Sequence, residues 1–251
     1  MIDGAELGGL TVLITGGTRR IGFAIAAECA RAGANVVMNY VRDQERAGKS
    51  VSAIEARGGR ALAVQADVRQ PGQVEKMVKV AVERFGSVDV LVNSAALRPH
   101  SALSELSLAA WHDVLGIILD GAFICARACA PHLVRSGRGA IVNIGGLVAE
   151  RGNAQAVHVS AAKSGLIGLT RALARHFGPL GVTVNCLTPG CILDDDDEAE
   201  RRARASPTEA IPMGRPGSPQ DVAGVVRALV GPGFRFYTGQ NLHLNGGSFM
   251  A

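Results

Sequence analysis

The feature that most constrains this chain is the regular alternation of short apolar runs with longer segments of helical periodicity. Runs rich in β-branched residues predict seven strands, at 10–15, 35–40, 61–66, 88–93, 140–145, 182–187 and 240–244. Between two of these strands, apolar residues recur at helical spacing over 74–85. This alternation predicts an α/β fold in which helices cover both faces of a seven-stranded parallel sheet, so the strands should be apolar on both sides.

Such a sheet has the doubly wound Rossmann architecture, and 251 residues suit one domain of this type. The chain shows neither an internal repeat nor a Ser/Pro-rich linker, so we expect a single domain over 1–251. Composition changes abruptly at the charged stretch DDDDEAERRAR, 194–204. We expect a lid around 191–215.

Charge and cysteine content narrow the class of protein. The net charge is +4, but the arginines are scattered rather than gathered into a stripe, so we expect no nucleic-acid partner. The five cysteines form no CxxC pair, no apolar leader opens the sequence, and no stretch of about 18 uninterrupted apolar residues occurs. These features predict a cytoplasmic protein with reduced thiols and no membrane segment.

Two groups of residues raise the question of a metal site. The four acids at 194–197 are consecutive in a loop and lack a rigid ligand arrangement. Cys125 and Cys129 share a helix face but have no nearby His partner in sequence, so we expect them to pack in the core. We expect no metal.

The first predicted strand runs directly into a glycine-rich turn, TGGTRRIG at 15–22, and then into a helix. Glycines in such a turn let backbone amides and the helix N-terminus approach a pyrophosphate, although tight strand-to-helix turns also use glycine without any ligand. Further polar or small residues follow other strands: Asp67-Val68, Asn93-Ser94-Ala95 and Pro189-Gly190. Each lies at the carboxyl end of a strand, where an open parallel sheet binds its ligand.

In this order, the motifs resemble those of the short-chain dehydrogenase/reductase family from Leu10 to Phe249. The resemblance rests on TGGTRRIG, Asp67, NSAA at 93–96, Lys163, NCLTPG at 185–190 and YTGQNLHLNGG at 237–247. It implies a nicotinamide dinucleotide site and, commonly, a homotetramer. The cofactor contacts that it implies fall on Thr15, Gly16, Thr18, Arg19, Arg20, Ile21, Gly22, Tyr40, Arg42, Asp67, Val68, Asn93, Ser94, Ala95, Lys163, Pro189, Gly190 and Ile192.

The end of the second strand bears on cofactor choice. A site that selects NAD usually places an acid there, but this chain has Tyr40. No carboxylate is there to repel a 2′-phosphate, and Arg19 and Arg42 could bind one, since arginine suits the geometry of a phosphate. We therefore expect NADPH to be preferred over NADH; the alternative is that both arginines are solvated surface charges.

The catalytic positions depart from the family. The family places a Tyr four residues before its Lys, where the ammonium lowers the pKa of the phenol. Here the Lys is Lys163 and the Tyr position is Val159. Family spacing puts the substrate-orienting Ser at Gly146 and the supporting Asn at Ile118. These three positions are apolar or bare.

The two tyrosines of the chain, Tyr40 and Tyr237, lie away from position 159. General acid catalysis is worth roughly 100- to 10,000-fold, so its loss leaves a poor carbonyl reductase. His100, in the loop after NSAA, is the candidate substitute acid, while His158 and Ser160 are rotated from the Lys163 face. A solvated loop histidine is the alternative for His100.

Two hypotheses follow. The first is an oxidoreductase that acts on a small, fairly apolar substrate with a non-standard proton source; an activated double bond or a substrate that carries its own acid would suit Val159. The second is a catalytically silent relative that binds the dinucleotide as a sensor, scaffold or partner subunit.

Overall fold

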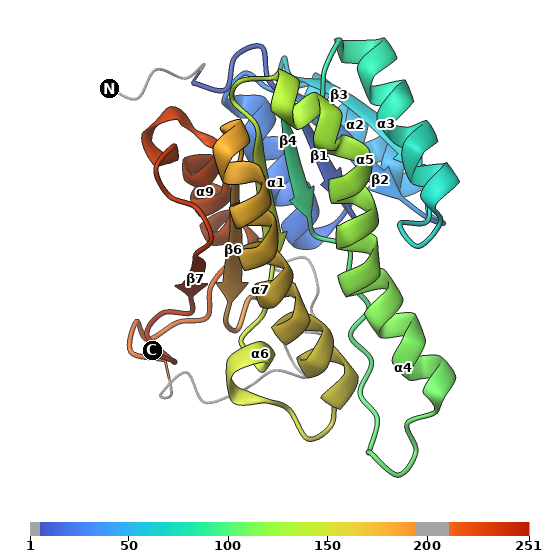
Figure 1. Cartoon of the computed structure of the whole chain (residues 1–251), viewed down its shortest axis with the longest axis vertical. Coiled ribbons are helices and arrows are strands. Elements are labelled where there is room, and N and C mark those ends of the chain that lie inside the picture. Colours follow the sequence, from blue (N-terminus) through green and yellow to red (C-terminus); the bar gives the residue numbers. More distant parts are fainter. Residues whose placement is uncertain (1–5, 194–210, 251) are drawn as a thin grey trace.

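The computed structural model describes residues 6–193 and 211–250. Its strands form one parallel sheet in the order β3-β2-β1-β4-β5-β6-β7 (Figure 1). Their bounds are β1 (Thr11–Thr15), β2 (Asn35–Tyr40), β3 (Arg60–Gln65), β4 (Val90–Asn93), β5 (Ala140–Ile144), β6 (Thr183–Pro189) and β7 (Asn241–Leu244). The predicted seven-stranded, doubly wound sheet is confirmed.

The strand bounds differ from the prediction where side chains or neighbours intervene. Before β4, the Asp89 carboxylate accepts hydrogen bonds from the Thr11 amide (2.7 Å) and the Ser87 hydroxyl (2.6 Å), and the strand begins at Val90. β6 continues to Pro189 because that residue pairs with Leu244 on β7. The expectation of burial on both faces fails for the edge strands β3 and β7, which are partly exposed.

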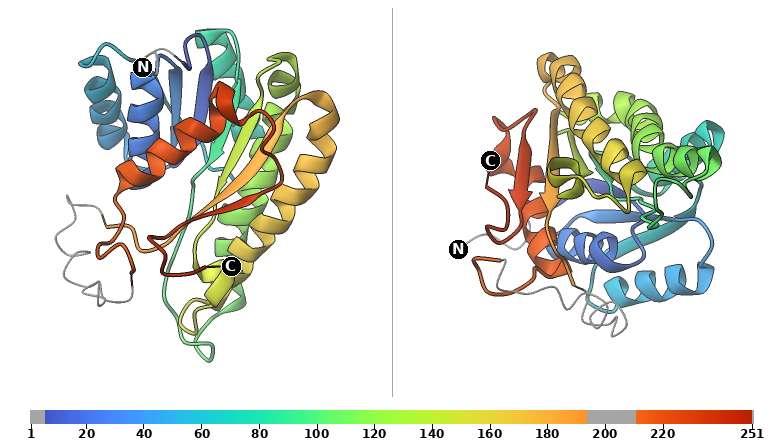
Figure 2. Two further views of the ribbon diagram at one scale, coloured as in Figure 1. Left: turned by 90° about the vertical axis from the view of Figure 1, so that its left-hand side faces the viewer. Right: turned by 90° about the horizontal axis from the view of Figure 1, so that it is seen from below.

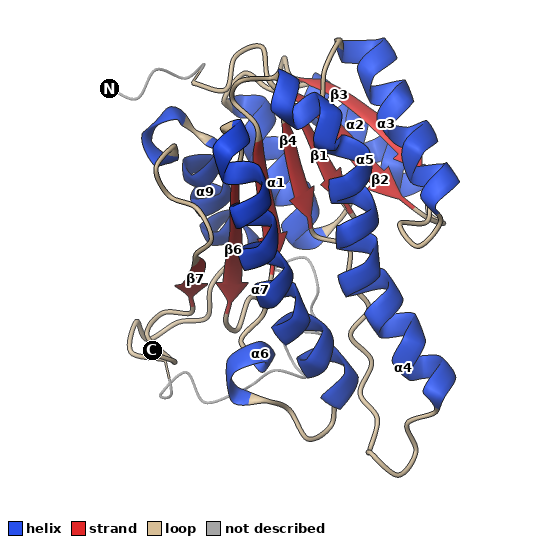
Figure 3. Cartoon of the chain, in the orientation of Figure 1, coloured by secondary structure: helices blue, strands red, loops and turns tan. Residues whose placement is uncertain are grey.

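Helices cover both faces of the sheet, as Figure 2 and the colouring of Figure 3 show. Alternate side chains of β1 divide between them: Val12 and Ile14 pack toward α1 and α9, whereas Leu13 packs toward α3 and α5. The helices are α1 (Arg20–Arg31), α2 (Gln44–Glu55), α3 (Pro71–Phe85), α4 (Leu108–Leu115), α5 (Gly121–Arg135), α6 (Val148–Arg151), α7 (Val157–Phe177) and α9 (Pro219–Val230). The segment predicted helical at 74–85 lies within α3.

A π-helical turn, η1 (Gly116–Asp120), joins α4 to α5 without a break. Two short 3₁₀ turns, η2 (Gly178–Leu180) and η4 (Pro232–Phe234), follow α7 and α9. Widened turns of the η1 type occur often at functional sites. Here the turn contains Ile118, one of the three substituted catalytic positions.

The joined helix Leu108–Arg135 has one buried face and one exposed apolar face. Cys125, Cys129 and Leu133 are fully buried, while Leu108 is 70% and Phe123 48% exposed. Within the described residues, this helix alone is long and apolar enough to cross a membrane by those two criteria, and 39% of its most apolar window is buried. The buried face makes it a core helix of the sheet structure, and its outer face remains available for another apolar surface.

The strand order reverses between β1 and β4, because the chain winds from β1 out to β3 and then returns to the other side of β1. Helices leave this point on opposite faces of the sheet. A crevice at the carboxyl ends of the strands is the usual ligand site of such a sheet. The predicted cofactor residues Thr15, Asn93, Ser94 and Ala95 lie at that edge.

Candidate active site

The carboxyl ends of β1 and β4 are tied together by one hydroxyl. Thr15 Oγ1 accepts hydrogen bonds from the backbone amides of Ser94 and Ala95, both at 3.0 Å. A β-carbon on Gly16 would lie 3.2 Å from the Ala95 Cα, so the bare glycine lets the two strand ends approach closely. These residues therefore lie together at the carboxyl edge of the sheet.

The glycine-rich turn has little room for side chains. A β-carbon on Gly22 would lie 2.2 Å from the Gly16 carbonyl oxygen, and Gly16 itself has φ +63°. Among the described residues, Arg20 is the one residue other than glycine that has a positive φ, +48°. Left-handed backbone costs an L-residue roughly 1–2 kcal/mol, so this turn retains a glycine geometry without the glycine.

Sequence reasoning missed Asn39, which links three strand ends. Its Oδ1 accepts from the Gly16 amide (3.3 Å), and its Nδ2 donates to the Ala66 carbonyl oxygen (2.7 Å). The signal was present: a buried asparagine near the end of an apolar strand needs hydrogen-bond partners. Asn39 therefore fixes the turn against the loop that carries Asp67.

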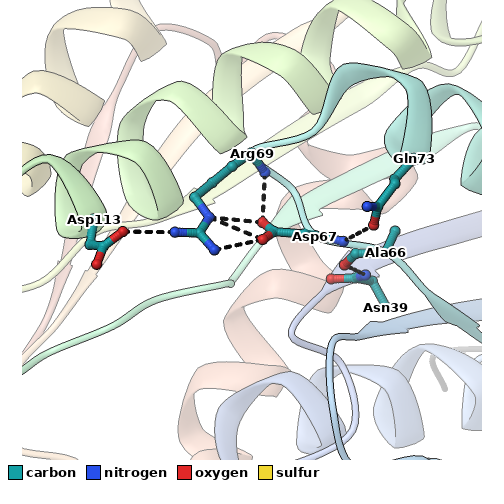
Figure 4. Close-up of polar contacts among 6 residues, drawn as sticks. All are labelled: Asn39, Ala66, Asp67, Arg69, Gln73 and Asp113. Atoms are coloured by element: carbon teal, nitrogen blue, oxygen red, sulfur yellow. Dashed lines mark hydrogen bonds and ion pairs between the residues drawn. The ribbon is translucent and has the colours of Figure 1, made fainter.

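Asp67 follows β3 and is held by Arg69 (Figure 4). Its two carboxylate oxygens accept from the Arg69 guanidinium at 2.6–3.1 Å and from the Arg69 amide at 3.0 Å. These side-chain bonds, opposed by partial burial, lower the pKa of the Asp67 carboxyl below its ordinary value. Val68, the next predicted contact, is 3% exposed and packs in the core.

The end of β2 carries the residues predicted to select the cofactor. Tyr40 is half-buried there, and Arg19 and Arg42 are exposed. The carboxylate of Asp43 is turned away, because it caps α2 by accepting from the Arg46 amide (2.9 Å) and Nε (3.0 Å). Arg42 lies close enough to Asp67 for its charge to contribute to the lowered pKa of that carboxyl.

Asn93 begins a buried amide network that crosses the middle of the sheet edge. Its Nδ2 donates to Asn143 Oδ1 (2.8 Å), and Asn143 Nδ2 donates to the Thr170 hydroxyl on α7 (2.9 Å). The Oδ1 atom of Asn93 is buried and has no hydrogen-bond partner among the described residues. A buried acceptor without a partner is uncommon and calls for a ligand or ordered water.

Lys163 lies on α7 with its ammonium at the end of β5. Its Nζ donates to the Ile144 carbonyl oxygen (2.5 Å), and the side chain is buried. Burial lowers its pKa to about 8; the neighbouring Cys186 opposes the shift, and the charge of Arg98 adds to it. The amine is therefore still protonated at neutral pH.

The three substituted catalytic positions surround this lysine with little polarity. Val159, one helical turn before Lys163, and Ile118 on η1 are both buried in one apolar cluster with Val114, Ala122, Ala156, Ala162 and Leu166. A β-carbon on Gly146 would meet only Val148 Cγ2, at 3.9 Å. The serine position is thus open, whereas the tyrosine and asparagine positions are filled with hydrocarbon.

The candidate substitute acid His100 is exposed in the loop after β4. That loop is attached to the start of α7, since the Ser101 amide donates to the Gln155 carbonyl oxygen (2.8 Å). His158 is fully buried, and neither of its ring nitrogens has a partner among the described residues. Burial lowers the pKa of His158, and the nearby His100 adds to the effect.

The end of β6 carries the last predicted contacts. The Gly190 amide donates to the Leu244 carbonyl oxygen (2.9 Å), and the Pro189 carbonyl oxygen accepts from the Leu147 amide (3.1 Å). Ile192 forms a parallel β-bridge with Gly217, so the chain segments on the two sides of the predicted lid are paired there. Asp194 and the acidic run 194–197 lie outside the described residues.

The cysteines pack as predicted. Burial raises the pKa of the Cys125 thiol to about 12 and that of Cys129 well above its ordinary value. Over residues 6–193 and 211–250, no three His, Cys, Asp or Glu side chains gather in a way that could hold a metal ion.

Comparison with known proteins gives the family. The family model described as Enoyl-(Acyl carrier protein) reductase matches residues 16–248. A 3-oxoacyl-[acyl-carrier-protein] reductase of Staphylococcus epidermidis is 37% identical over 96% of this chain and 99% of its own.

Two similar solved structures contain a nicotinamide dinucleotide. A short-chain dehydrogenase from Burkholderia cenocepacia, in complex with NADP, is 36% identical with a TM-score of 0.88 over 97% of this chain and 99% of its own. A blue fluorescent protein from a metagenomic library, in complex with NADPH, is 35% identical with a TM-score of 0.88 over 98% and 100%. With the sheet order and the edge described above, these matches establish that the chain belongs to the short-chain dehydrogenase/reductase family.

Proposed function

We propose that this chain is an NADP(H)-dependent oxidoreductase that acts on a small, fairly apolar substrate with a proton source other than tyrosine. The observation that carries the proposal is the contrast at α7. Lys163 keeps a protonated amine at the cofactor edge, while Val159 one turn earlier is buried in hydrocarbon. The chain therefore has the family's lysine, but the position of the family's tyrosine holds a valine.

The residues at the crevice fit a dinucleotide. The Gly22 position is bare because the backbone of Gly16 occupies the space of its β-carbon, so the turn presents peptide groups rather than side chains. The orphaned Asn93 Oδ1 offers a buried acceptor at the same edge. Thr15, Ser94 and Ala95 would line the site between these two points.

The choice of NADPH over NADH rests on charge at the end of β2. Arg19 and Arg42 supply two guanidinium groups that suit a 2′-phosphate, and Arg offers planar, bidentate donors to such a group. The nearest following carboxylate, Asp43, is committed to capping α2. A ribose 2′-hydroxyl would therefore find no acceptor there of the kind that NAD sites use.

When bound, NADPH would supply a hydride, and the chain's own residues must handle the proton. Lys163 would hold the nicotinamide ribose with its ammonium and give the active centre a positive charge. Val159 and Ile118 exclude water from the adjoining cluster and transfer no proton. An activated carbon–carbon double bond suits this arrangement, because its reduction tolerates a proton from solvent or from His100. The description of the matching family model names an enoyl substrate, which supports this class.

A second candidate function is a catalytically silent protein that binds the dinucleotide as a sensor, scaffold or partner subunit. Its support is the number of substituted positions: Val159, Ile118 and Gly146 together lack every hydroxyl and amide that the family uses. Removing one such group lowers the catalytic rate, and removing all three is compatible with a site that binds the dinucleotide without turnover.

One set of assays separates the two. Wild-type protein with NADPH is tested on matched α,β-unsaturated and saturated carbonyl compounds. We expect turnover of the unsaturated set, lost or reduced in Lys163→Ala, and reduced in His100→Ala if that histidine supplies the proton. The triple variant Val159→Tyr/Gly146→Ser/Ile118→Asn should gain activity on saturated carbonyls. Turnover by the triple variant alone would favour the silent protein, and failure of wild type to bind NADPH would refute both.

We also propose a cytoplasmic homotetramer without a nucleic-acid or membrane partner. The helix Leu108–Arg135 has an exposed apolar face that includes Leu108 and Phe123, and this face supports self-association rather than a monomer. Light scattering on the purified protein tests the assembly: a mass four times that of the chain is expected, and a monomer would refute it.

A further inference from the structure

The loop 145–147, between β5 and α6, runs along the end of β6. The backbone amides of its first and last residues, Gly145 and Leu147, donate to carbonyl oxygens of β6 at 2.7 and 3.1 Å. Lys163 Nζ binds the carbonyl oxygen of the residue just before the loop. The middle residue is Gly146, the open serine position, so the loop lies at the carboxyl edge of the sheet between the buried amine and β6.

Side chains of β6 occupy the space beside the bare Gly145. A β-carbon there would lie 2.7 Å from Thr188 Oγ1 and 2.9 Å from Cys186 Sγ. The Thr188 hydroxyl donates to Asn241 Oδ1 on β7 at 2.6 Å. Because that proton is committed, the Cys186 thiol is the donor in its 3.9 Å contact with Thr188 Oγ1. A line of polar side chains therefore runs from beside the loop to β7.

The line ends on one carboxylate. Glu150 lies on α6, four residues after Gly146, and its Oε1 accepts from Asn241 Nδ2 at 2.6 Å and from His243 Nε2 at 3.1 Å. A carboxylate oxygen accepts both bonds, so the proton of the second bond is carried by His243 Nε2. The Glu150 and His243 side chains are 24% and 21% exposed, so both bonds are largely shielded from water. Glu150 thus joins α6 to two residues of β7.

The next residue of α6 packs on the C-terminal segment. The Arg151 guanidinium carbon lies 5.9 Å from the centre of the Phe249 ring, and the His243 ring meets the same ring edge-on at 5.3 Å. Asn245 Nδ2 donates to the Phe249 carbonyl oxygen at 2.9 Å, which fixes the backbone there. α6 is therefore attached both to β7 and to the segment that follows it.

α6 depends on such contacts because it is short. It has four residues, and a helix of that length is not stable alone. α7 adds one bond, from the Ser164 hydroxyl to the Ala149 carbonyl oxygen at 3.0 Å. Since α6 begins two residues after Gly146, a tilt of this helix would move the loop 145–147.

We propose that Glu150 is a positioning residue: by accepting from Asn241 and His243, it holds the loop 145–147 against the nicotinamide half of a bound dinucleotide. The inference rests on the proposed function, in which Lys163 binds the nicotinamide ribose beside this loop. It gives β7 a role at the active centre, although no residue of that strand is among the predicted contacts with the cofactor.

The test separates the two halves of the dinucleotide. NADPH is compared with adenosine 2′,5′-bisphosphate, which carries the adenine, the ribose and the 2′-phosphate but no nicotinamide. Calorimetric titration of the full-length protein gives a dissociation constant for each ligand, without any turnover. Both ligands should bind to wild type, and only the binding of NADPH should depend on the loop.

Glu150→Ala removes the acceptor of both bonds, so it should weaken NADPH binding about tenfold and leave binding of the bisphosphate within about twofold. Glu150→Gln keeps an acceptor oxygen, so its NADPH affinity should stay within about threefold of wild type. Thr188→Val removes the hydroxyl that holds Asn241 and should give a smaller loss for NADPH alone. The matched control Glu83→Ala removes an exposed carboxylate on α3 and should change neither constant.

Three results would overturn the inference: unchanged NADPH binding in Glu150→Ala, an equal loss for both ligands, or a loss in Glu150→Gln as large as in Glu150→Ala. Urea denaturation shows whether each variant folds. If Glu150→Ala does not fold, Thr188→Val must still weaken NADPH binding selectively for the inference to stand. Wild type that binds neither ligand refutes the proposed function itself and is thereby distinguishable from these results.

Discussion

The ammonium nitrogen of Lys163 on α7 donates a 2.5 Å hydrogen bond to the carbonyl oxygen of Ile144, the last residue of β5. This bond holds a buried cation at the carboxyl edge of the sheet, two residues before the open Gly146 position. Because the charge is buried, its protonation affects the stability of the fold.

We predict that stability depends on pH through Lys163, with a definite sign. Burial lowers the pKa of its amine from 10.5 to about 8. Between these pH values the unfolded chain binds more protons than the folded one, so this group's contribution to stability rises as pH increases. Below pH 8 both states are protonated, and the folded state bears the full cost of the buried charge.

Comparison with Lys163→Met measures this contribution. At about 1.4 kcal/mol per pKa unit, the variant should be more stable than wild type at pH 7 by up to about 3 kcal/mol. The difference should shrink as the pH rises from 8 to 10.5. Urea denaturation of both proteins at a series of pH values gives the two curves, and a difference that stays constant with pH would contradict the buried charge.

We predict that Gly22→Ala disrupts the turn. Its β-carbon would lie 2.2 Å from the Gly16 carbonyl oxygen, which is backbone and cannot rotate away. The free energy of unfolding should fall by about 2 kcal/mol or more, with loss of NADPH binding. Gly146→Ala is the control, because its β-carbon meets only Val148 at 3.9 Å; it should stay within about 0.5 kcal/mol of wild type. Similar stability of the two variants would refute the turn geometry.

The strained residue Arg20 gives a third prediction. The backbone at Arg20 has φ +48°, which only glycine adopts without steric cost. The Arg20→Gly variant should therefore be more stable than Arg20→Ala by about 0.5–1 kcal/mol. Both variants lose the same side-chain contacts, so their difference isolates the backbone. Arg19 has φ −155°, and there the alanine variant should be the more stable one. Thermal denaturation of the glycine and alanine variants at both positions tests whether the stability difference between them has opposite signs at Arg19 and Arg20.

Ile118, which is buried at the position of the family's asparagine, gives a fourth prediction. Ile118→Asn places an amide in the apolar cluster around Val114 and Val159, with no polar partner described there. The expected loss is about 2–3 kcal/mol, against about 1 kcal/mol for Ile118→Val. Urea denaturation compares them. A neutral Ile118→Asn would mean that this position can reach water or a polar group, and the account of a hydrocarbon-filled site would fail.

The strand pattern and the gathering of the strand-end residues at one edge of the sheet were predictable because both follow from local chemistry. Apolar β-branched runs define strands, and small or polar residues at their ends, such as Thr15 and Asn93, lie together once the strands are parallel. Val159 was recognisable as a substitution because the helical spacing to Lys163 is fixed.

The contacts between distant segments were not predictable in this way. The bond from Arg69 to Asp113 joins residues far apart in sequence, and nothing in either segment marks the other as its partner. The same holds for Asn39, whose two partners lie on other strand ends. Side-chain exposure at β3 and β7 also depends on their places at the sheet edges, which come from strand order rather than from composition.

We propose that this chain keeps a working NADP(H) site around Lys163 without the tyrosine-dependent proton transfer of its family. The most direct measurement is a fluorescence titration of the wild-type protein with NADPH and NADH in parallel. We predict saturable binding of NADPH, tighter than that of NADH by about tenfold or more, since one dinucleotide alone carries the 2′-phosphate that Arg19 and Arg42 suit. Absence of saturable binding by either dinucleotide would contradict the account.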